Sequence, residues 1–150
     1  MGKRPEGAVD FTEFMEAALY DRELGYYMRD ASIIGEKGDF ITAPQMSPLF
    51  SHALARQIAQ IIEPIVNPIV LEIGAGTGAM AVELLRELAR LDRLPDQYQI
   101  LERSPALRER QRKSIEVLPA SLVARVAWVD EASAMRGAVV ANELFDALAV

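Results

Sequence analysis

The sequence predicts an α/β fold with a doubly wound, mostly parallel sheet. The apolar run 70–73 enters a glycine turn that continues directly into the helix-forming stretch 79–91. Three further runs, 97–102, 124–130 and 137–142, have the composition of strands. Strands that alternate with helices are typical of parallel sheets, because a parallel pair needs a long crossover connection.

The chain divides into an N-terminal region, 1–67, and a sheet-bearing region, 68–150. A minimal nucleotide-binding domain does not need the first of these regions. Asp10 and Glu13 have the spacing of a capping box, which predicts a helix over 11–20. The N-terminal region is therefore predicted to be an ordered cap made of helices and loops.

Two Ser-Pro pairs predict helix starts, since serine caps free amides and proline suits the first helical position. Ser47-Pro48 begins a helix that Pro64 ends, and Ser104-Pro105 begins a basic helix through about Val117. The charged residues of this basic helix are expected to form a solvated face. In the first helix we expect the apolar residues to face the core: Leu49, Phe50, Ala53, Leu54, Ile58, Ile61 and Ile62.

The glycine turn carries Gly74, Gly76 and Gly78 at alternate positions. Glycine permits backbone angles that a Cβ atom forbids, and it lets backbone amides approach a ligand. Gly74-x-Gly76-x-x-Ala79 also fits the fingerprint of dinucleotide sites, so the glycines alone leave two ligands open. Glu72 would repel a pyrophosphate but attract the ammonium and sulfonium groups of S-adenosylmethionine (SAM), so it favours SAM.

Each predicted strand ends in a polar group. Glu102 closes the second strand, where an acid can accept from both ribose hydroxyls of a nucleotide, and Asp130 closes the third. Asn142 and Glu143 follow the fourth. Ligands of open parallel sheets bind outside the carboxyl ends of the strands, so we expect these groups to converge with Glu72 on one rim.

Composition excludes several classes of protein. The 150 residues contain no cysteine and one histidine, His52, which excludes disulfide scaffolds and thiolate metal sites; we expect no metal. A net charge of −6 and a pI near 4.9 argue against a general nucleic-acid binder and suit a basic partner. No apolar run reaches the roughly 20 residues of a membrane span, and no signal or transit peptide is visible, so we expect a cytoplasmic, bacterial-type protein.

The sequence resembles the MidA-like family of SAM-dependent methyltransferases, which includes the mitochondrial complex I assembly factor that acts on a protein arginine. The resemblance spans nearly the whole chain. Its residues are Ala18-Leu19-Tyr20-Asp21, Leu24-Gly25-Tyr26-Tyr27, Gly38-Asp39-Phe40-Ile41-Thr42-Ala43-Pro44, Ser47-Pro48-Leu49-Phe50, the loop 72–78, and Asn142-Glu143-Leu144-Phe145-Asp146-Ala147-Leu148.

The resemblance implies a Rossmann-like class I methyltransferase fold whose N-terminal region covers the cofactor. It implies SAM as cofactor, a protein substrate with an arginine target, and arginine N-methylation linked to respiratory complex assembly. The implied cofactor-binding residues are Glu72, Gly74, Ala75, Gly76, Gly78, Glu102, Asp130 and Thr42. The implied catalytic residues are Asn142, Glu143 and Asp146; the carboxylates of Glu143 and Asp146 could hold a guanidinium and localise its charge.

Two alternatives stay open: a non-catalytic assembly module that keeps the nucleotide fold, and an NAD-binding oxidoreductase domain. The sequence stops at Val150, soon after the fourth strand, whereas members of the family are longer. We therefore expect a sheet truncated after this strand, with an exposed apolar edge at Val139-Val140-Ala141. Such a chain would be a fragment, a homo-oligomer or a chain completed by a missing half.

Overall fold

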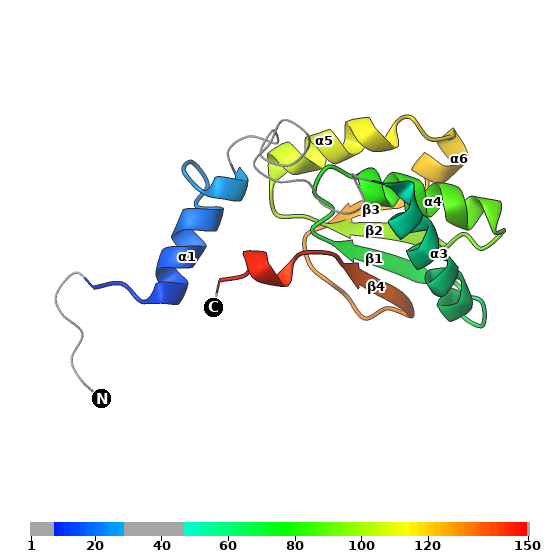
Figure 1. Cartoon of the computed structure of the whole chain (residues 1–150), viewed down its shortest axis with the longest axis horizontal. Helices are drawn as coiled ribbons and strands as arrows, with labels where there is room; N and C mark the ends of the chain where they lie inside the picture. Colours follow the sequence, from blue (N-terminus) through cyan, green and yellow to red (C-terminus); the bar gives the residue numbers. More distant parts are fainter. Residues whose placement is uncertain (1–7, 29–46, 150) are drawn as a thin grey trace.

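A parallel sheet forms the centre of the molecule. The computed structural model describes residues 8–28 and 47–149 (Figure 1). Within these residues the strands are β1 (Ile69–Ile73), β2 (Gln97–Leu101), β3 (Val126–Val129) and β4 (Gly137–Ala141). They pair in the order β3-β2-β1-β4, and every pair is parallel. The predicted α/β class with a parallel sheet is confirmed.

Helices occupy the segments that the capping signals predicted. They are α1 (Phe11–Tyr20), α3 (Pro48–Ile62), α4 (Ala79–Arg90), α5 (Pro105–Ile115) and α6 (Ala120–Val123), with 3-10 turns η1 (Tyr26–Met28) and η3 (Phe145–Ala147). The sequence did not predict α6. None of the helices in the described ranges is long and apolar enough to cross a bilayer.

Local hydrogen bonds explain where these helices begin. Asp10 and Glu13 form the predicted capping box at α1. Ser47 accepts from the Leu49 N–H at α3, and Ser104 accepts from the Leu107 N–H at α5. These side chains satisfy amides that have no partner inside the helix, so each start is fixed by short-range chemistry that the sequence reveals.

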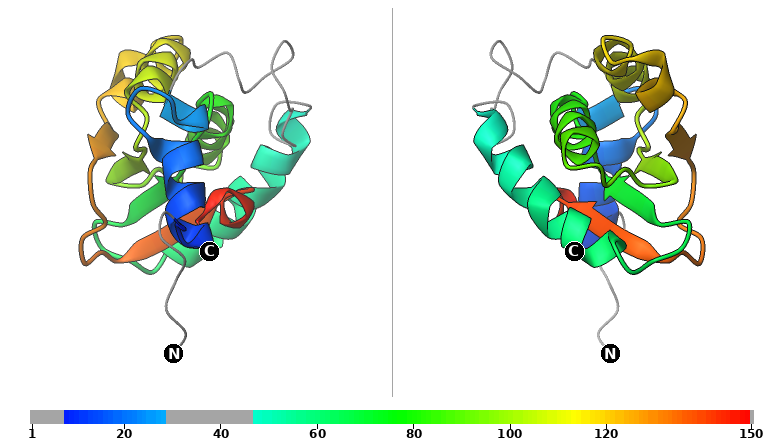
Figure 2. Two further views of the ribbon diagram at one scale, coloured as in Figure 1. Left: turned by 90° about the vertical axis from the view of Figure 1, so that its left-hand side faces the viewer. Right: turned by 90° about the vertical axis from the view of Figure 1, so that its right-hand side faces the viewer.

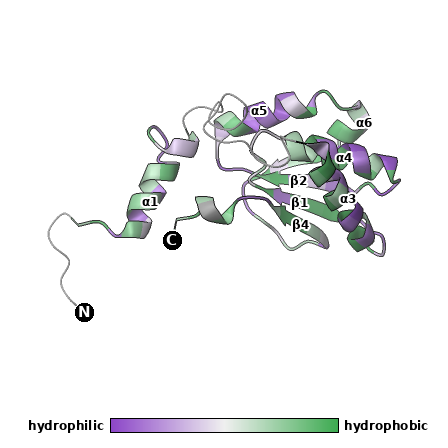
Figure 3. Cartoon of the chain, in the orientation of Figure 1, coloured by the Kyte–Doolittle hydropathy of each residue, from purple (hydrophilic) through white to green (hydrophobic). Residues whose placement is uncertain are grey.

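The core lies between one face of the sheet and the helices α3, α4 and α5 (Figures 1 and 2). Strand residues on this face are buried, among them Val70, Tyr98 and Ile100. Leu84 and Leu88 of α4 are fully buried against them. Figure 3 shows the contrast between the hydrophobic strands and the largely hydrophilic α5. Burying this apolar surface is the main force that holds the helices on the sheet.

The structure corrects the prediction of which face of α3 packs on the core. Leu49 and Ile61 are 75% and 50% exposed. The prediction is confirmed for Ile58 and Ile62, and Leu54 is partly buried against the core. The complete buried stripe is Ser51, Ala55, Ile58, Ala59 and Ile62. Small residues at three of these positions let α3 pack closely against α4, and the larger apolar residues on the outer side are left in solvent. Apolar residues surround much of this helix, so their spacing did not identify the packed side.

Charged groups add a second connection between α3 and α4. Arg90 donates to both oxygens of the buried Glu87 at 2.7 Å, and Arg56 of α3 approaches the same carboxylate at 3.7 Å. The Arg90 hydrogen bonds lower the pKa of Glu87 to about 2. The carboxylate therefore stays ionised and paired at any physiological pH.

Within the described residues β4 is an edge strand, with β3 at the other edge. Val139 of β4 is 60% exposed, and Ala141 is also exposed. The predicted exposure is therefore confirmed for Val139 and Ala141 but wrong for Val140, which is buried. The division of the chain at residues 67 and 68 stays a prediction, although α3 shares its core with the sheet.

Candidate functional site

The four strands end at one level. In the sheet register Ile73 lies beside Leu101 and Ala141, and Leu101 lies beside Val129. The next residue of each strand therefore starts the same edge of the sheet: Gly74, Glu102, Asp130 and Asn142. The register confirms the expected convergence for Glu102, Asp130 and Asn142, whereas Glu72 lies inside β1, one residue before its end. In an open parallel sheet this rim is where ligands bind.

The glycine loop adopts the backbone for which glycine is suited. Gly74, Gly76 and Gly78 have φ values of 70°, 53° and 81°. Gly78 is the N-cap of α4 and has no side chain to cap it, so the first turn of α4 begins at the rim. The Ala79 N–H of this turn donates to Thr77 Oγ1 at 3.4 Å. The Gly74 N–H donates to the Leu101 carbonyl at 3.0 Å, which ties the start of the loop to the end of β2.

Glu72 is buried on the helix-covered face of the sheet. It is 1% exposed and accepts a hydrogen bond from the Tyr98 hydroxyl at 2.6 Å through Oε2. Its other oxygen, Oε1, has no partner among the described residues. Burial raises the pKa of Glu72 to about 7; the Tyr98 hydrogen bond opposes this shift, and the nearby Glu102 adds to it. Glu72 therefore does not point into solvent, as a glutamate near the end of a strand ordinarily would.

Glu102 is also buried, and its carboxylate is held in place. Oε1 accepts from the Ser104 N–H, and Oε2 accepts from Gln111 Nε2, each at 3.0 Å. Burial raises the pKa of Glu102 above its ordinary value, against the effect of these hydrogen bonds. A carboxylate with two oxygens and several lone pairs keeps acceptor capacity for ligand hydroxyls.

Asp130 differs from the other acids. Its side chain is 90% exposed, and its Oδ1 accepts from Arg108 at 2.6 Å. Arg108 also donates to the carbonyls of Glu102 and Val129, so it joins the ends of β2 and β3. An exposed ion pair of this kind contributes little stability by itself. The assignment of Asp130 to the cofactor stays a prediction.

The segment after β4 carries the candidate catalytic residues. Asn142 is half-buried, and Glu143 is exposed with a left-handed backbone, φ 50°. Leu144 lies over the glycine loop, because its Cδ1 is 2.9 Å from where a Cβ on Gly74 would stand. Asp146 lies in η3, but its side chain and the whole of Thr42 are outside the described residues.

The left-handed backbone of Glu143 is unusual for its residue type. Asn67 and Asp92 also have positive φ, but their short polar side chains tolerate this conformation. Glutamate has no such compensation, and strained positions of this kind concentrate at functional sites. The conformation places an exposed carboxylate next to the rim that the four strands form.

Helix α1 lies beyond the carboxyl ends of the strands (Figure 1). The Tyr20 hydroxyl donates to the Ala147 carbonyl at 2.5 Å, while Arg103 pairs with Glu16 at 2.7 Å and lies 4.4 Å over the Tyr20 ring. These contacts join α1 to the segments that follow β2 and β4. The helix thus lies on the side where the resemblance places a cover.

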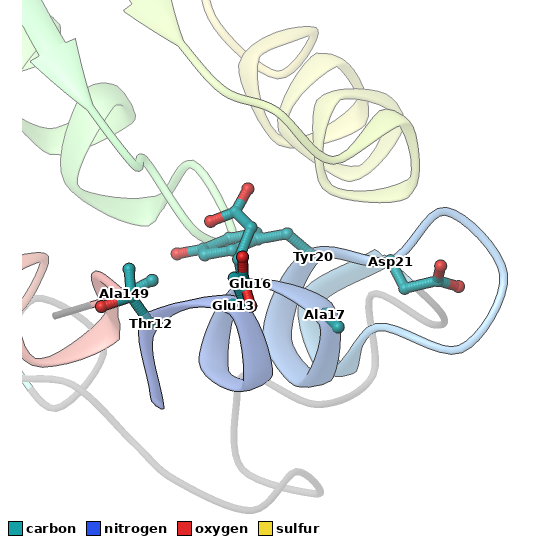
Figure 4. A pocket seen from close by; sticks show the side chains of 7 residues that line it. All are labelled: Thr12, Glu13, Glu16, Ala17, Tyr20, Asp21 and Ala149. Carbon is teal, nitrogen blue, oxygen red and sulfur yellow. The ribbon is translucent and has the colours of Figure 1, made fainter. Parts of the chain in front are cut away.

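A cavity of about 620 Å³ lies along α1. Its lining is rich in carboxylates and also includes the last described residue: Thr12, Glu13, Glu16, Ala17, Tyr20, Asp21 and Ala149. Figure 4 shows the side chains of these residues around the cavity. Two of its lining carboxylates already have partners, because Glu16 pairs with Arg103 and Glu13 accepts from the Asp10 N–H.

Sequence inspection missed several residues that hold the site together. Tyr98, Arg108, Gln111 and Ser114 make hydrogen bonds to Glu72, Glu102 or the glycine loop. One available signal was the spacing of Leu107, Gln111 and Ile115, the buried face of α5, where a glutamine occupies the middle of an apolar stripe. The expectation that the charged residues of this helix form only a solvated face is wrong for Arg108, which is 21% exposed.

The residues present fit a nucleotide cofactor with a positive charge. The loop supplies left-handed glycines that let a ligand approach the backbone, and Glu102 supplies a fixed acceptor for ribose hydroxyls. Glu72 supplies a buried carboxylate oxygen without a partner. A cation at this oxygen would complete its hydrogen bonding, whereas a pyrophosphate would add a second negative charge to it.

Comparisons with known proteins agree with this fit. Residues 53–150 match the model of the family described as "Putative S-adenosyl-L-methionine-dependent methyltransferase". Among solved structures, a candidate methyl transferase from Burkholderia thailandensis bound to S-adenosyl-homocysteine is 40% identical, with a TM-score of 0.87 over 94% of this chain and 38% of that one. Its bound ligand is the product form of SAM, and SAM is the cofactor of the matched family.

Two curated relatives carry a more specific name. The mitochondrial protein arginine methyltransferase NDUFAF7 of Xenopus laevis is 33% identical over 74% of this chain and 28% of its own length. The Homo sapiens protein of the same name is 34% identical over 57% of this chain and 20% of its own length. The chain thus spans less than a third of the curated relatives it matches. By its matched residues and its fold, the chain belongs to the family of S-adenosyl-L-methionine-dependent methyltransferases.

Proposed function

We propose that the chain is the cofactor-binding part of a protein arginine N-methyltransferase linked to respiratory complex assembly. The observation that carries the proposal is the buried Glu72 oxygen without a partner, next to a loop of left-handed glycines. The names of the curated relatives support the arginine acceptor. Bound SAM supplies a methyl group activated by its sulfonium; the side chains of this chain bind, orient and shield.

Each group at the rim has a separate task in this proposal. Glu72 faces the positive charge of the cofactor, and Glu102 accepts from its ribose hydroxyls. Gly74, Ala75, Gly76 and Gly78 bring the backbone close to the ligand. Helix α1, beyond the carboxyl ends of the strands, would exclude water from this side of the crevice, which strengthens the charge interactions inside it.

An arginine acceptor needs help from carboxylates, because its guanidinium stays protonated in water and its nitrogens are poor nucleophiles. Glu143 would accept two charge-assisted hydrogen bonds from the guanidinium and draw its positive charge away from the attacking nitrogen. Asn142 and Asp146 are proposed as its neighbours in this task. The net charge of −6 supports a basic protein partner.

Replacing Glu143 by Gln tests this assignment. We expect turnover with an arginine-containing peptide to fall by about 10- to 100-fold, while the dissociation constant for SAM changes by less than about twofold. Calorimetry measures binding, and mass spectrometry of the peptide measures transfer. Glu116→Gln, at an exposed carboxylate that ends α5, is the matched control and should leave both values unchanged. Full turnover in the Glu143 variant would remove this residue from the mechanism.

The non-catalytic module remains the second candidate, and the same assay separates the two. If a preparation that contains the whole rim binds SAM but methylates none of the arginine peptides, the non-catalytic module is favoured.

A further inference from the structure

A fully buried glutamine lies at the centre of the cofactor rim. Gln111 of α5 has no exposed surface. Its Nε2 donates to the Gly76 carbonyl and to Glu102 Oε2, each at 3.0 Å. Its Oε1 accepts from Trp128 Nε1 of β3 at 2.9 Å. One side chain therefore joins the glycine loop, the second strand end and the third strand.

The orientation of this amide follows from the chemistry of its partners. An indole N–H can only donate, so the amide oxygen of Gln111 must face Trp128. The amide NH₂ group then faces Gly76 O and the Glu102 carboxylate, both of which accept. A flipped amide would set its oxygen against two acceptors and its NH₂ against a donor. The network has one satisfied arrangement.

Helix α5 holds the glycine loop by a second contact on the same face. Ser114 Oγ donates to the Thr77 carbonyl at 2.8 Å, and the Cα of Gln111 is 3.2 Å from where a Cβ on Gly78 would stand. Positions 111 and 114 lie three apart and share a face of the helix. Two successive carbonyls of the loop, those of Gly76 and Thr77, are therefore fixed by α5. Because both carbonyls are held, the peptide groups that carry them cannot rotate freely.

We propose that Gln111 is a positioning residue for cofactor binding: it fixes the Glu102 carboxylate, with the glycine loop, in the geometry that receives the ribose of SAM. The proposal rests on the assignment of Glu102 to the ribose hydroxyls made above. Gln111 itself touches the carboxylate, not the ligand. Its Nε2 donates to one oxygen of Glu102 while the Ser104 N–H donates to the other, so the carboxylate plane is set from both sides.

The test is a binding cycle with two ligands, S-adenosylhomocysteine and its counterpart that lacks both ribose hydroxyls. For Gln111→Leu we expect about tenfold weaker binding of S-adenosylhomocysteine and less than about a twofold change for the dideoxy ligand. A role confined to folding would weaken both ligands by the same factor, and that result would overturn the proposal. Gln57→Leu, at an exposed glutamine of α3, is the control and should change neither affinity.

Two further variants keep the test decisive. Trp128→Phe removes the donor that orients the amide but keeps Gln111 and an aromatic ring; we expect it to reduce the preference for the ribose hydroxyls by about threefold. An unchanged preference in this variant would overturn the proposal even if Gln111→Leu does not fold. Glu102→Gln should lose most of the preference. If Glu102→Gln keeps the full preference for the ribose hydroxyls, the assignment of Glu102 to the ribose fails and this proposal fails with it. If the wild-type protein binds neither ligand, the proposed function itself is refuted.

Discussion

Replacing Glu72 by Gln should stabilise the unliganded protein at alkaline pH and leave its stability at pH 4 nearly unchanged. Burial raises the pKa of Glu72 from 4.5 to about 7. Between these two values the folded state holds a proton that the unfolded state has lost, so wild-type stability falls as pH rises through this window and levels off above it. Above pH 7 the difference in pKa corresponds to a loss of about 3 kcal/mol in the unfolding free energy of the wild type. The glutamine variant does not titrate and does not have this loss.

The same substitution should weaken SAM binding. A cation near the unpartnered Oε1 favours the ionised carboxylate, so the wild-type affinity should rise between pH 6 and pH 8. In Glu72→Gln the affinity should be lower and independent of pH. Urea unfolding and calorimetry across pH 4–9 measure the two effects, and Glu63→Gln at an exposed carboxylate is the control.

If Glu72 lowers the free energy of unfolding of the unliganded protein and raises its affinity for SAM, its role is ligand binding and not folding. A gain in stability that is the same at pH 4 and pH 9 would show that Glu72 does not titrate in this window. Tight, pH-independent SAM binding by the variant would show that it does not face the cofactor.

Replacing Gly137 by Ala should have the largest effect on folding. Gly137 has φ 150° and starts β4, and a Cβ on it would lie 1.8 Å from the Ile69 carbonyl oxygen. This contact is with backbone, so it can be relieved only by moving β4 away from β1 at the start of their pairing. We expect a loss of at least about 3 kcal/mol in unfolding free energy, beyond an ordinary overpacked side chain.

Gly74→Ala is the matched comparison for this prediction. Among the described residues, a Cβ there would meet only the Leu144 Cδ1 atom, the end of a flexible side chain, at 2.9 Å, so the main cost is the left-handed φ of 70°. It should therefore cost less stability than Gly137→Ala but impair cofactor binding more, since Gly74 starts the loop. Chemical denaturation and SAM titration of both variants give the order. Equal losses of stability in the two would contradict the role assigned to the pairing of β4 with β1.

Local chemistry explains which parts of the fold could be predicted. The capping box at Asp10 and the serine cap at Ser104 depend on contacts within three residues, and both are present as predicted. The strands were found because apolar runs end at recognisable turns. The face of α3 could not be found in the same way, because Ser51, Ala55 and Ala59 are buried only for the close approach of α4.

In the candidate site, too, the residues that depend on local sequence could be predicted, and those that depend on long-range contacts could not. Glu102 and Asn142 follow predictable strand ends, so their place on the rim could be foreseen. Gln111 could not, since its three partners lie 35, 9 and 17 residues away and meet only after the sheet forms. Alternation along β1 places Glu72 on the same face as Val70, but its burial could not be predicted from this pattern, because Leu71 on the opposite face is buried as well.

The central claim is that the crevice holds a buried negative charge for a positively charged methyl donor. Calorimetric titration of the chain with SAM and, separately, with NAD at pH 8 tests it most directly. We predict that SAM binds with release of less than one proton per site and that NAD gives no saturable heat. Saturable binding of NAD, with none of SAM, would contradict the claim.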